Sequence, residues 1–108
     1  MGRVFYIKRG DRGPSLRATL YADDTRAVIN LTEASSVRFH MASTPPVDAA
    51  ATVEDAEGGV VRYDWVAGDT DQAGEWDAEF EITWNDGRKQ TVPSKGYLKV
   101  YIGEDLDA

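Results

Sequence analysis

The clearest signal in the chain is a strict alternation of apolar and polar residues over residues 75–84. The apolar positions are Trp76, Ala78, Phe80, Ile82 and Trp84, and the residues between them are acidic or threonine. In a β-strand successive side chains point to opposite faces, so five alternate apolar residues share one face. The pattern therefore predicts a half-buried strand with an acidic outer face. It also predicts that Trp76, Phe80 and Trp84 face the core.

Shorter runs with the same period of two predict further strands. They cover residues 4–7, 15–21, 36–41, 60–65, 88–92 and 97–102, with short additional strands at 28–31 and 51–54. Turn residues lie between them; Asn85-Asp86-Gly87, which tolerate positive φ, are a strong hairpin signal. Residues 47–57 are alanine-rich and acidic and leave room for one turn of helix. Short strands with turns every 8–12 residues or so indicate an all-β fold, either a two-sheet sandwich or a small barrel.

Length and charge narrow the function classes. The chain has 108 residues, which predicts one domain over 1–108. Its net charge of -7 argues against nucleic acid as a partner, because duplex binding needs clustered cations. No apolar run approaches the roughly 20 residues of a membrane helix, and the N-terminus lacks the apolar core of a signal peptide. We therefore expect synthesis in the cytoplasm and no membrane partner.

The charges are unevenly placed along the chain. Residues 1–17 carry five basic side chains against Asp11 alone, whereas residues 54–86 carry eleven acids against Arg62 alone. Two interpretations follow: the two sets face solvent or pair within one fold, or they make a dipolar subunit that stacks on partners of opposite sign.

Catalytic chemistry finds little support in the residues. There is no cysteine, and His40 is the single histidine, expected on the outer face of its strand without a nucleophile elbow. The carboxylates of residues 75–81 are expected to pair across strands with Arg38, Arg62, Arg88 and Lys89 rather than to form a hydrolase pair. Asp69 and Asp71 match only a fragment of a calcium loop; an acidic hairpin loop is the main interpretation and a calcium site the minor one. We expect no enzyme activity, no cofactor and no metal.

Four segments taken together resemble the N-terminal immunoglobulin-like domain of the baseplate upper protein family of siphophages. They are a strand running into Arg9-Gly10-Asp11 and residues 16–20, the step Asn30-Leu31-Thr32 before residues 36–41, residues 59–65 followed by 71–76, and residues 84–88 leading to Thr91-Val92-Pro93. The likeness spans about residues 4 to 102. It implies an immunoglobulin-like two-sheet β-sandwich of about seven to eight antiparallel strands.

The resemblance also implies a function. We expect a non-enzymatic structural or assembly protein of a tailed-phage virion, in the baseplate, tail, neck or capsid surface, that contacts other virion proteins in a symmetric multi-copy assembly. The expected interface is the opening strand, apolar on both faces, with its flanking basic residues: Arg3, Val4, Phe5, Tyr6, Ile7, Lys8, Arg9 and Arg12. Cover of both faces within the domain, for example by residues 47–57, is the alternative. A carbohydrate-binding adhesion module with weak glycan binding is the rival function, with Tyr21, Tyr97 and Tyr101 as outward aromatics.

Overall fold

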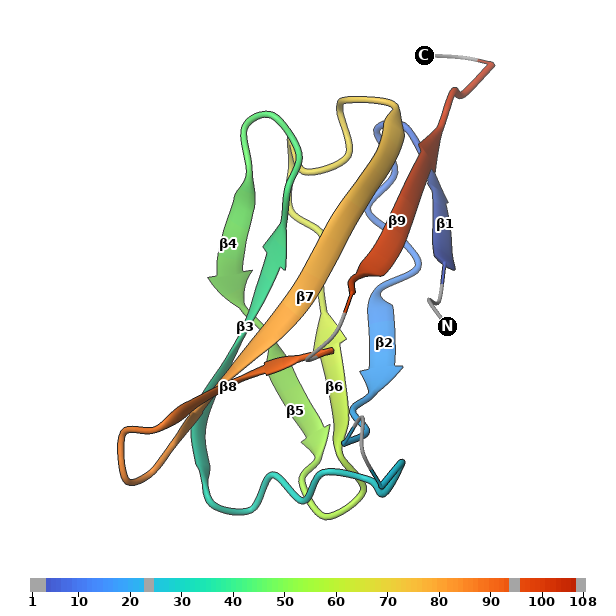
Figure 1. Cartoon of the computed structure of the whole chain (residues 1–108). Coiled ribbons are helices and arrows are strands. Elements are labelled where there is room, and N and C mark those ends of the chain that lie inside the picture. The colour runs from blue at the N-terminus through green and yellow to red at the C-terminus, as the bar shows by residue number, and fades with distance from the viewer. Residues whose placement is uncertain (1–3, 23–24, 94–95, 107–108) are drawn as a thin grey trace.

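The computed structural model describes residues 4–22, 25–93 and 96–106, and within them the chain forms nine β-strands and no helix (Figure 1). The all-β prediction is confirmed. The strands are β1 (Val4–Lys8), β2 (Leu16–Thr19), β3 (Ala34–Met41), β4 (Val47–Ala50), β5 (Thr52–Asp55), β6 (Val60–Tyr63), β7 (Gly74–Trp84), β8 (Lys89–Val92) and β9 (Leu98–Gly103). None of the described residues forms a helix that might span a membrane.

The strands form two sheets. The larger has the order β1–β9–β7–β3–β4, with β8 also paired to β7, and the smaller has the order β2–β6–β5. The triplets β9–β7–β3 and β2–β6–β5 correspond to the G–F–C and B–E–D strands of an immunoglobulin-like sandwich, so that prediction is confirmed as well. The expectation of uniformly antiparallel pairing needs one correction, because β1 runs parallel to β9.

The core lies between the two sheets and follows the predicted alternation. Phe39 on β3 and Phe80 on β7 lie directly opposite each other in the register of these two strands. Their side chains are 0% and 2% exposed. From the smaller sheet, Leu16, Val61 and Tyr63 close the core. Trp76 and Trp84 share the inner face of β7 but are only half-buried, because they lie toward the two ends of this long strand.

Two local predictions are wrong. Residues 47–57 contain no helical turn; they form β4 and β5, which lie in different sheets. Residues 28–31 do not form a strand, and only Val28 makes an isolated bridge, to Tyr21. The Arg9-Gly10 turn lies where the sequence predicts it, with Gly10 at a φ of 85°, a conformation that suits glycine.

Candidate functional site

The outer side of β1 is exposed at the edge of the larger sheet. Phe5 and Ile7 point inward, with the Phe5 ring 5.9 Å from that of Trp65. Val4 and Tyr6 point outward and are 41% and 68% exposed. The alternative in which residues 47–57 cover this side is wrong, because β4 lies at the opposite edge of the same sheet and β5 lies in the other sheet.

Tyr6 has an aromatic neighbour on the same surface. It lies opposite Tyr101 in the β1–β9 register, with the ring centroids 5.7 Å apart in an edge-to-face arrangement. Tyr101 is 45% exposed. We call Val4, Tyr6 and Tyr101 the tyrosine patch. Tyrosines on a surface are typical anchors of interfaces, since a large apolar ring carries a polar tip.

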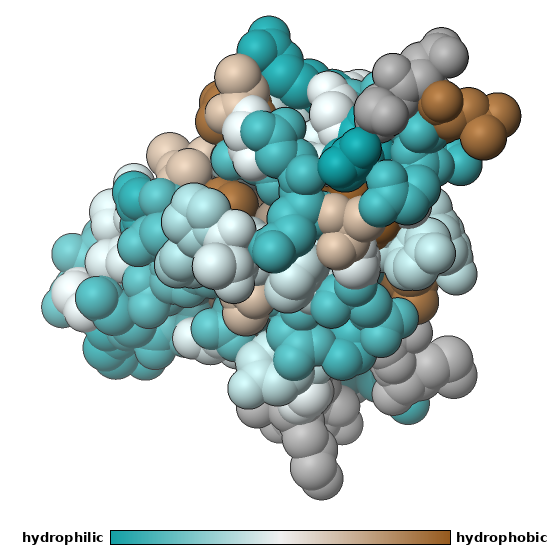
Figure 2. All heavy atoms as spheres, turned by 90° about the horizontal axis from the view of Figure 1, so that it is seen from above, coloured by the Kyte–Doolittle hydropathy of each residue, from teal (hydrophilic) through white to brown (hydrophobic). Residues whose placement is uncertain are grey.

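The other outward tyrosines do not extend this patch into one sugar-stacking face. Tyr97 is exposed on the outer side of the larger sheet beside His40 and Glu79. Tyr21 is exposed too, but it follows β2 of the smaller sheet. Figure 2 shows one end of the molecule, where apolar residues are scattered among hydrophilic ones.

The basic residues near β1 are partly engaged. Arg9 lies 3.3 Å from a Glu104 carboxylate oxygen, and Lys8 donates a 3.4 Å hydrogen bond to the Glu104 carbonyl. Arg12 is exposed. Arg3 of the expected interface lies outside the described residues. Of the basic residues next to β1, Arg12 is therefore exposed to a partner, while the charge of Arg9 is partly neutralised by Glu104.

Beside the tyrosine patch, β7 presents a row of acids, Glu75, Asp77, Glu79 and Glu81, on its outer face. Asp77 accepts a hydrogen bond from Lys99, which raises the pKa of that lysine. Glu79 lies 3.9 Å from His40, which is 30% exposed on the outer face as predicted. Glu75 and Glu81 form no ion pair with any residue in the described part of the chain.

The cations that we expect to pair with this row bond other acids or form no ion pair, although Arg38 lies directly opposite Glu81 in the β3–β7 register. Arg38 bonds Asp48 on β4, Arg62 bonds Glu54 and Asp64 in the smaller sheet, and Arg88 bonds Asp86 in its own hairpin. Within the described residues Lys89 makes no ion pair either. The expectation placed Arg38 correctly on a strand next to β7, but the period of two does not reveal that Asp48 on β4 competes for its guanidinium group.

The loop with the calcium-like fragment is held by its own hydrogen bonds. Asp69 accepts bonds from the Tyr63 hydroxyl at 2.6 Å and the Val66 amide at 2.9 Å, and the buried Thr70 hydroxyl donates to the Asp11 carbonyl at 2.8 Å. Across residues 4–22, 25–93 and 96–106, no three Asp, Glu or His side chains gather as metal ligands would. The geometry agrees with an acidic loop that closes one end of the sandwich.

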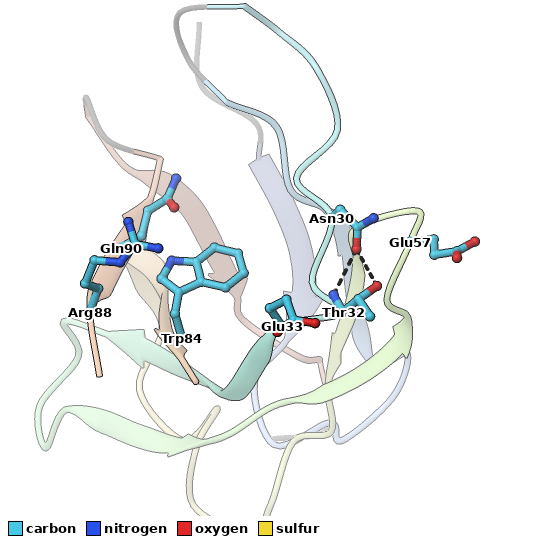
Figure 3. Close-up of a pocket in the computed structure, with 7 residues that line it drawn as sticks. All are labelled: Asn30, Thr32, Glu33, Glu57, Trp84, Arg88 and Gln90. Atoms are coloured by element: carbon cyan, nitrogen blue, oxygen red, sulfur yellow. Dashed lines mark hydrogen bonds between the residues drawn. The ribbon is translucent and has the colours of Figure 1, made fainter. Parts of the chain in front are cut away.

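A second surface feature was not predicted from the sequence. A hollow of about 600 Å³ lies where the β7–β8 hairpin meets the loop before β3, and Trp84 stands in it (Figure 3). The other lining residues are polar: Asn30, Thr32, Glu33, Glu57, Arg88 and Gln90. The alternation assigns Trp84 to the inner face of β7 correctly. It does not reveal that the smaller sheet covers this position only in part.

Comparison of the chain with protein-family models, with curated proteins and with solved structures finds no match.

Proposed function

We propose that this chain is a non-enzymatic assembly protein of a tailed-phage virion and that it attaches to other virion proteins through the tyrosine patch. The resemblance to the baseplate upper protein family supports the virion role. The immunoglobulin-like strand order is the fold which that resemblance implies. Particle proteins occur in many symmetric copies, so each copy needs one reproducible docking surface.

The observation that carries the proposal is the exposed tyrosine patch beside an open strand edge. A buried tyrosine contributes roughly 150–250 Å² of contact area, and aromatic residues dominate the energetics of many interfaces. Within the described residues β1 pairs only with β9, so its other edge is free to accept a strand from a partner. A partner on this surface would therefore have both an apolar anchor and a backbone template.

The acids of β7 indicate the charge of the partner. Glu75 lies next to Tyr101 in the β7–β9 register, whereas Glu81 lies further along the same face, opposite Arg38 on β3. Because Glu75 forms no ion pair within the described residues, a partner with a lysine or arginine beside an apolar centre would be complementary to it. This partner differs from the acidic one that the basic segment alone predicts.

The test uses phage particles grown without the native gene and supplied with the chain or its variants. Tyr6→Ser removes the centre of the patch, and Tyr21→Ser is the matched control because Tyr21 is also exposed but lies beyond β2. We expect the wild type and Tyr21→Ser to be incorporated equally, and Tyr6→Ser at least tenfold less. The measurement is quantitative mass spectrometry of purified particles.

Two outcomes would contradict different parts of the proposal. If the wild-type chain is missing from purified particles, the virion role is wrong. If Tyr6→Ser is incorporated like the wild type, the chain attaches elsewhere and the tyrosine patch is not the docking surface. Circular dichroism of each variant excludes misfolding as the cause, since Tyr6 points away from the core.

A further inference from the structure

The hollow around Trp84 has a structural origin in the length of β7. This strand has 11 residues, whereas each strand of the smaller sheet has four. The last part of β7 pairs with β8, and the hairpin that they form projects away from β1 (Figure 1). The inner face of this hairpin is therefore not fully covered by the second sheet.

Gln90 on β8 marks the same opening. It pairs with Ile82 in the β7–β8 register and shares its face of β8 with Val92, which is buried. A polar amide at a core-facing position is costly unless it has a partner or meets solvent. Gln90 instead lines the hollow beside Trp84, so its amide is available to a molecule bound there.

Three segments hold the walls of the hollow in place. The Trp84 amide donates to the Arg88 carbonyl at 2.8 Å and closes the hairpin. The Asn85 amide donates to the Glu33 carbonyl at 2.9 Å, and the Leu31 amide donates to the Ala56 carbonyl at 2.7 Å. The hairpin, the loop before β3 and the turn before β6 are thus joined by backbone hydrogen bonds, which preorganises the lining.

The indole of Trp84 differs from the other two indoles of the chain. Trp65 Nε1–H donates to the Pro14 carbonyl at 3.2 Å, and Trp76 Nε1–H donates to the Gln72 carbonyl at 3.1 Å. Trp84 Nε1–H has no acceptor within residues 4–22, 25–93 and 96–106. Asn30 uses its side-chain oxygen to accept from the Thr32 amide, which leaves its amide NH₂ group for a ligand.

From this geometry we infer that the hollow binds a neutral saccharide, with the indole of Trp84 as the stacking surface. A pyranose ring has an apolar C–H face and a rim of hydroxyls that both donate and accept hydrogen bonds. The indole matches the face, and the amides of Asn30 and Gln90 with the carboxylate of Glu33 match the rim. The hollow is wide open to solvent, so the saccharide would lie on the indole surface and would not be enclosed.

The charges of the lining residues disfavour anionic sugars. Glu33 and Glu57 are the acids of the lining, and the cation Arg88 is paired with Asp86 at 2.7 Å. Acids therefore outnumber the unpaired cations of the lining, so we expect a uronic acid or other anionic sugar to bind more weakly than a neutral one at low salt. This property separates the proposal from non-specific stacking on an exposed tryptophan.

The test is a titration of the full-length protein followed by its three indole N–H resonances in ¹H–¹⁵N spectra. The probes are chitotriose and maltotriose as neutral trisaccharides and trigalacturonate as the anionic one. We expect a saturable shift of the Trp84 resonance with at least one neutral probe, no shift of the Trp65 or Trp76 resonances, and weaker binding of trigalacturonate at low salt. Absence of a shift with both neutral probes, or an equal shift with trigalacturonate, would overturn the inference.

Variants on the two faces of β8 locate the site. Gln90→Ala removes a lining amide, and we expect about tenfold weaker binding, as the loss of one good hydrogen bond predicts. Lys89→Ala is the matched control, since the neighbouring side chain is on the opposite face of the strand, and it should bind like the wild type. Equal binding by both variants would place the saccharide elsewhere. Tyr6→Ser should leave saccharide binding unchanged, so this inference and the docking proposal fail independently.

Discussion

Phe39 is the centre of the aromatic core. Its ring stacks on Tyr63 at 4.5 Å and 19°, meets Trp65 edge-on at 5.7 Å and lies 5.3 Å from Phe80. Phe39 is on β3, and its partners come from β6, the segment after β6, and β7, so one cluster joins both sheets. Such ring pairs add about 0.5–1.5 kcal/mol each beyond the burial of their area.

Phe80→Ala should lower the free energy of unfolding by about 3–5 kcal/mol. The ring is 2% exposed, so its loss leaves a cavity between Phe39 and the smaller sheet as well as losing the transfer free energy. The measurement is equilibrium unfolding in urea, with Tyr97→Ala as an exposed control expected within about 0.5 kcal/mol of the wild type. A Phe80→Ala midpoint equal to that of the wild type would contradict the position of Phe80 in the core.

The inner face of β7 could be predicted residue by residue, but the depth of burial could not. Phe80 and Trp84 have the same parity in the alternating run, yet Phe80 is buried while Trp84 lines a hollow. The alternation of apolar and polar residues predicts which side of the strand a residue occupies. How much of that side is covered depends on the ends of β2, β5 and β6, which are distant in sequence.

Glu54 links the three strands of the smaller sheet on its outer face. Arg17 of β2 and Arg62 of β6 lie directly opposite each other, and two like charges at such a position repel. Glu54 on β5 accepts hydrogen bonds from both guanidinium groups, at 3.1 Å from Arg17 Nη2 and 2.7 Å from Arg62 Nη1. The hydrogen bonds from Arg17 and Arg62 lower the pKa of Glu54 to about 2.

Glu54→Gln should lower the melting temperature at pH 7 by a few degrees, because it removes the charge that separates the two arginines. The pKa of Glu54 is lower in the folded chain than its ordinary value of 4.5, so its ion pairs stabilise the fold above that value. This stabilisation is lost as the pH falls from about 4.5 toward 2. The difference between variant and wild type, measured by thermal melts across this range, should shrink accordingly.

A second substitution separates repulsion from other effects of the change. Arg17→Thr in the Glu54→Gln background removes one of the two facing cations, so part of the lost stability should return at pH 7 and low salt. High salt screens exposed charges and should reduce both effects. A pH-independent difference between Glu54→Gln and the wild type would show that the carboxylate charge is not the cause.

At the scale of elements, the alternating strands were predictable, and the alanine-rich segment was predicted only in part, because the expected strand at 51–54 corresponds to β5 but β4 was not expected. Residues 47–57 contain four alanines, three of them consecutive at 49–51, and few large apolar residues, which gives a strand little hydrophobic signal. They form two edge strands, β4 and β5. The pairing of β5 with β6 has an irregular register. Pairing with β3 and β6 decides the structure here, because local preference for a strand depends strongly on the neighbouring strands.

The uneven charges of the sequence pair partly within the fold. Arg17 from the basic N-terminal segment bonds Glu54 at the start of the acidic segment, and Arg9 lies beside Glu104. The acids of β7 face outward, but Lys99 and Arg38 lie opposite Asp77 and Glu81 on the neighbouring strands, so the outer side of the larger sheet carries charges of both signs. The molecule therefore combines an exposed apolar patch with a net charge of -7 over the whole chain.

That combination predicts a monomer in isolation. The tyrosine patch favours self-association, but each copy carries a net charge of -7, and like net charges oppose association. Sedimentation velocity at micromolar concentration and low salt should therefore give the mass of one 11.9 kDa chain, with an elongated shape consistent with extents of 45 × 26 × 21 Å. At about 1 M salt, where charge is screened beyond about 3 Å, weak association should appear and Tyr6→Ser should abolish it. A tight oligomer that forms equally at low and high salt would contradict this balance, because repulsion would then play no part in keeping the copies apart until a partner arranges them.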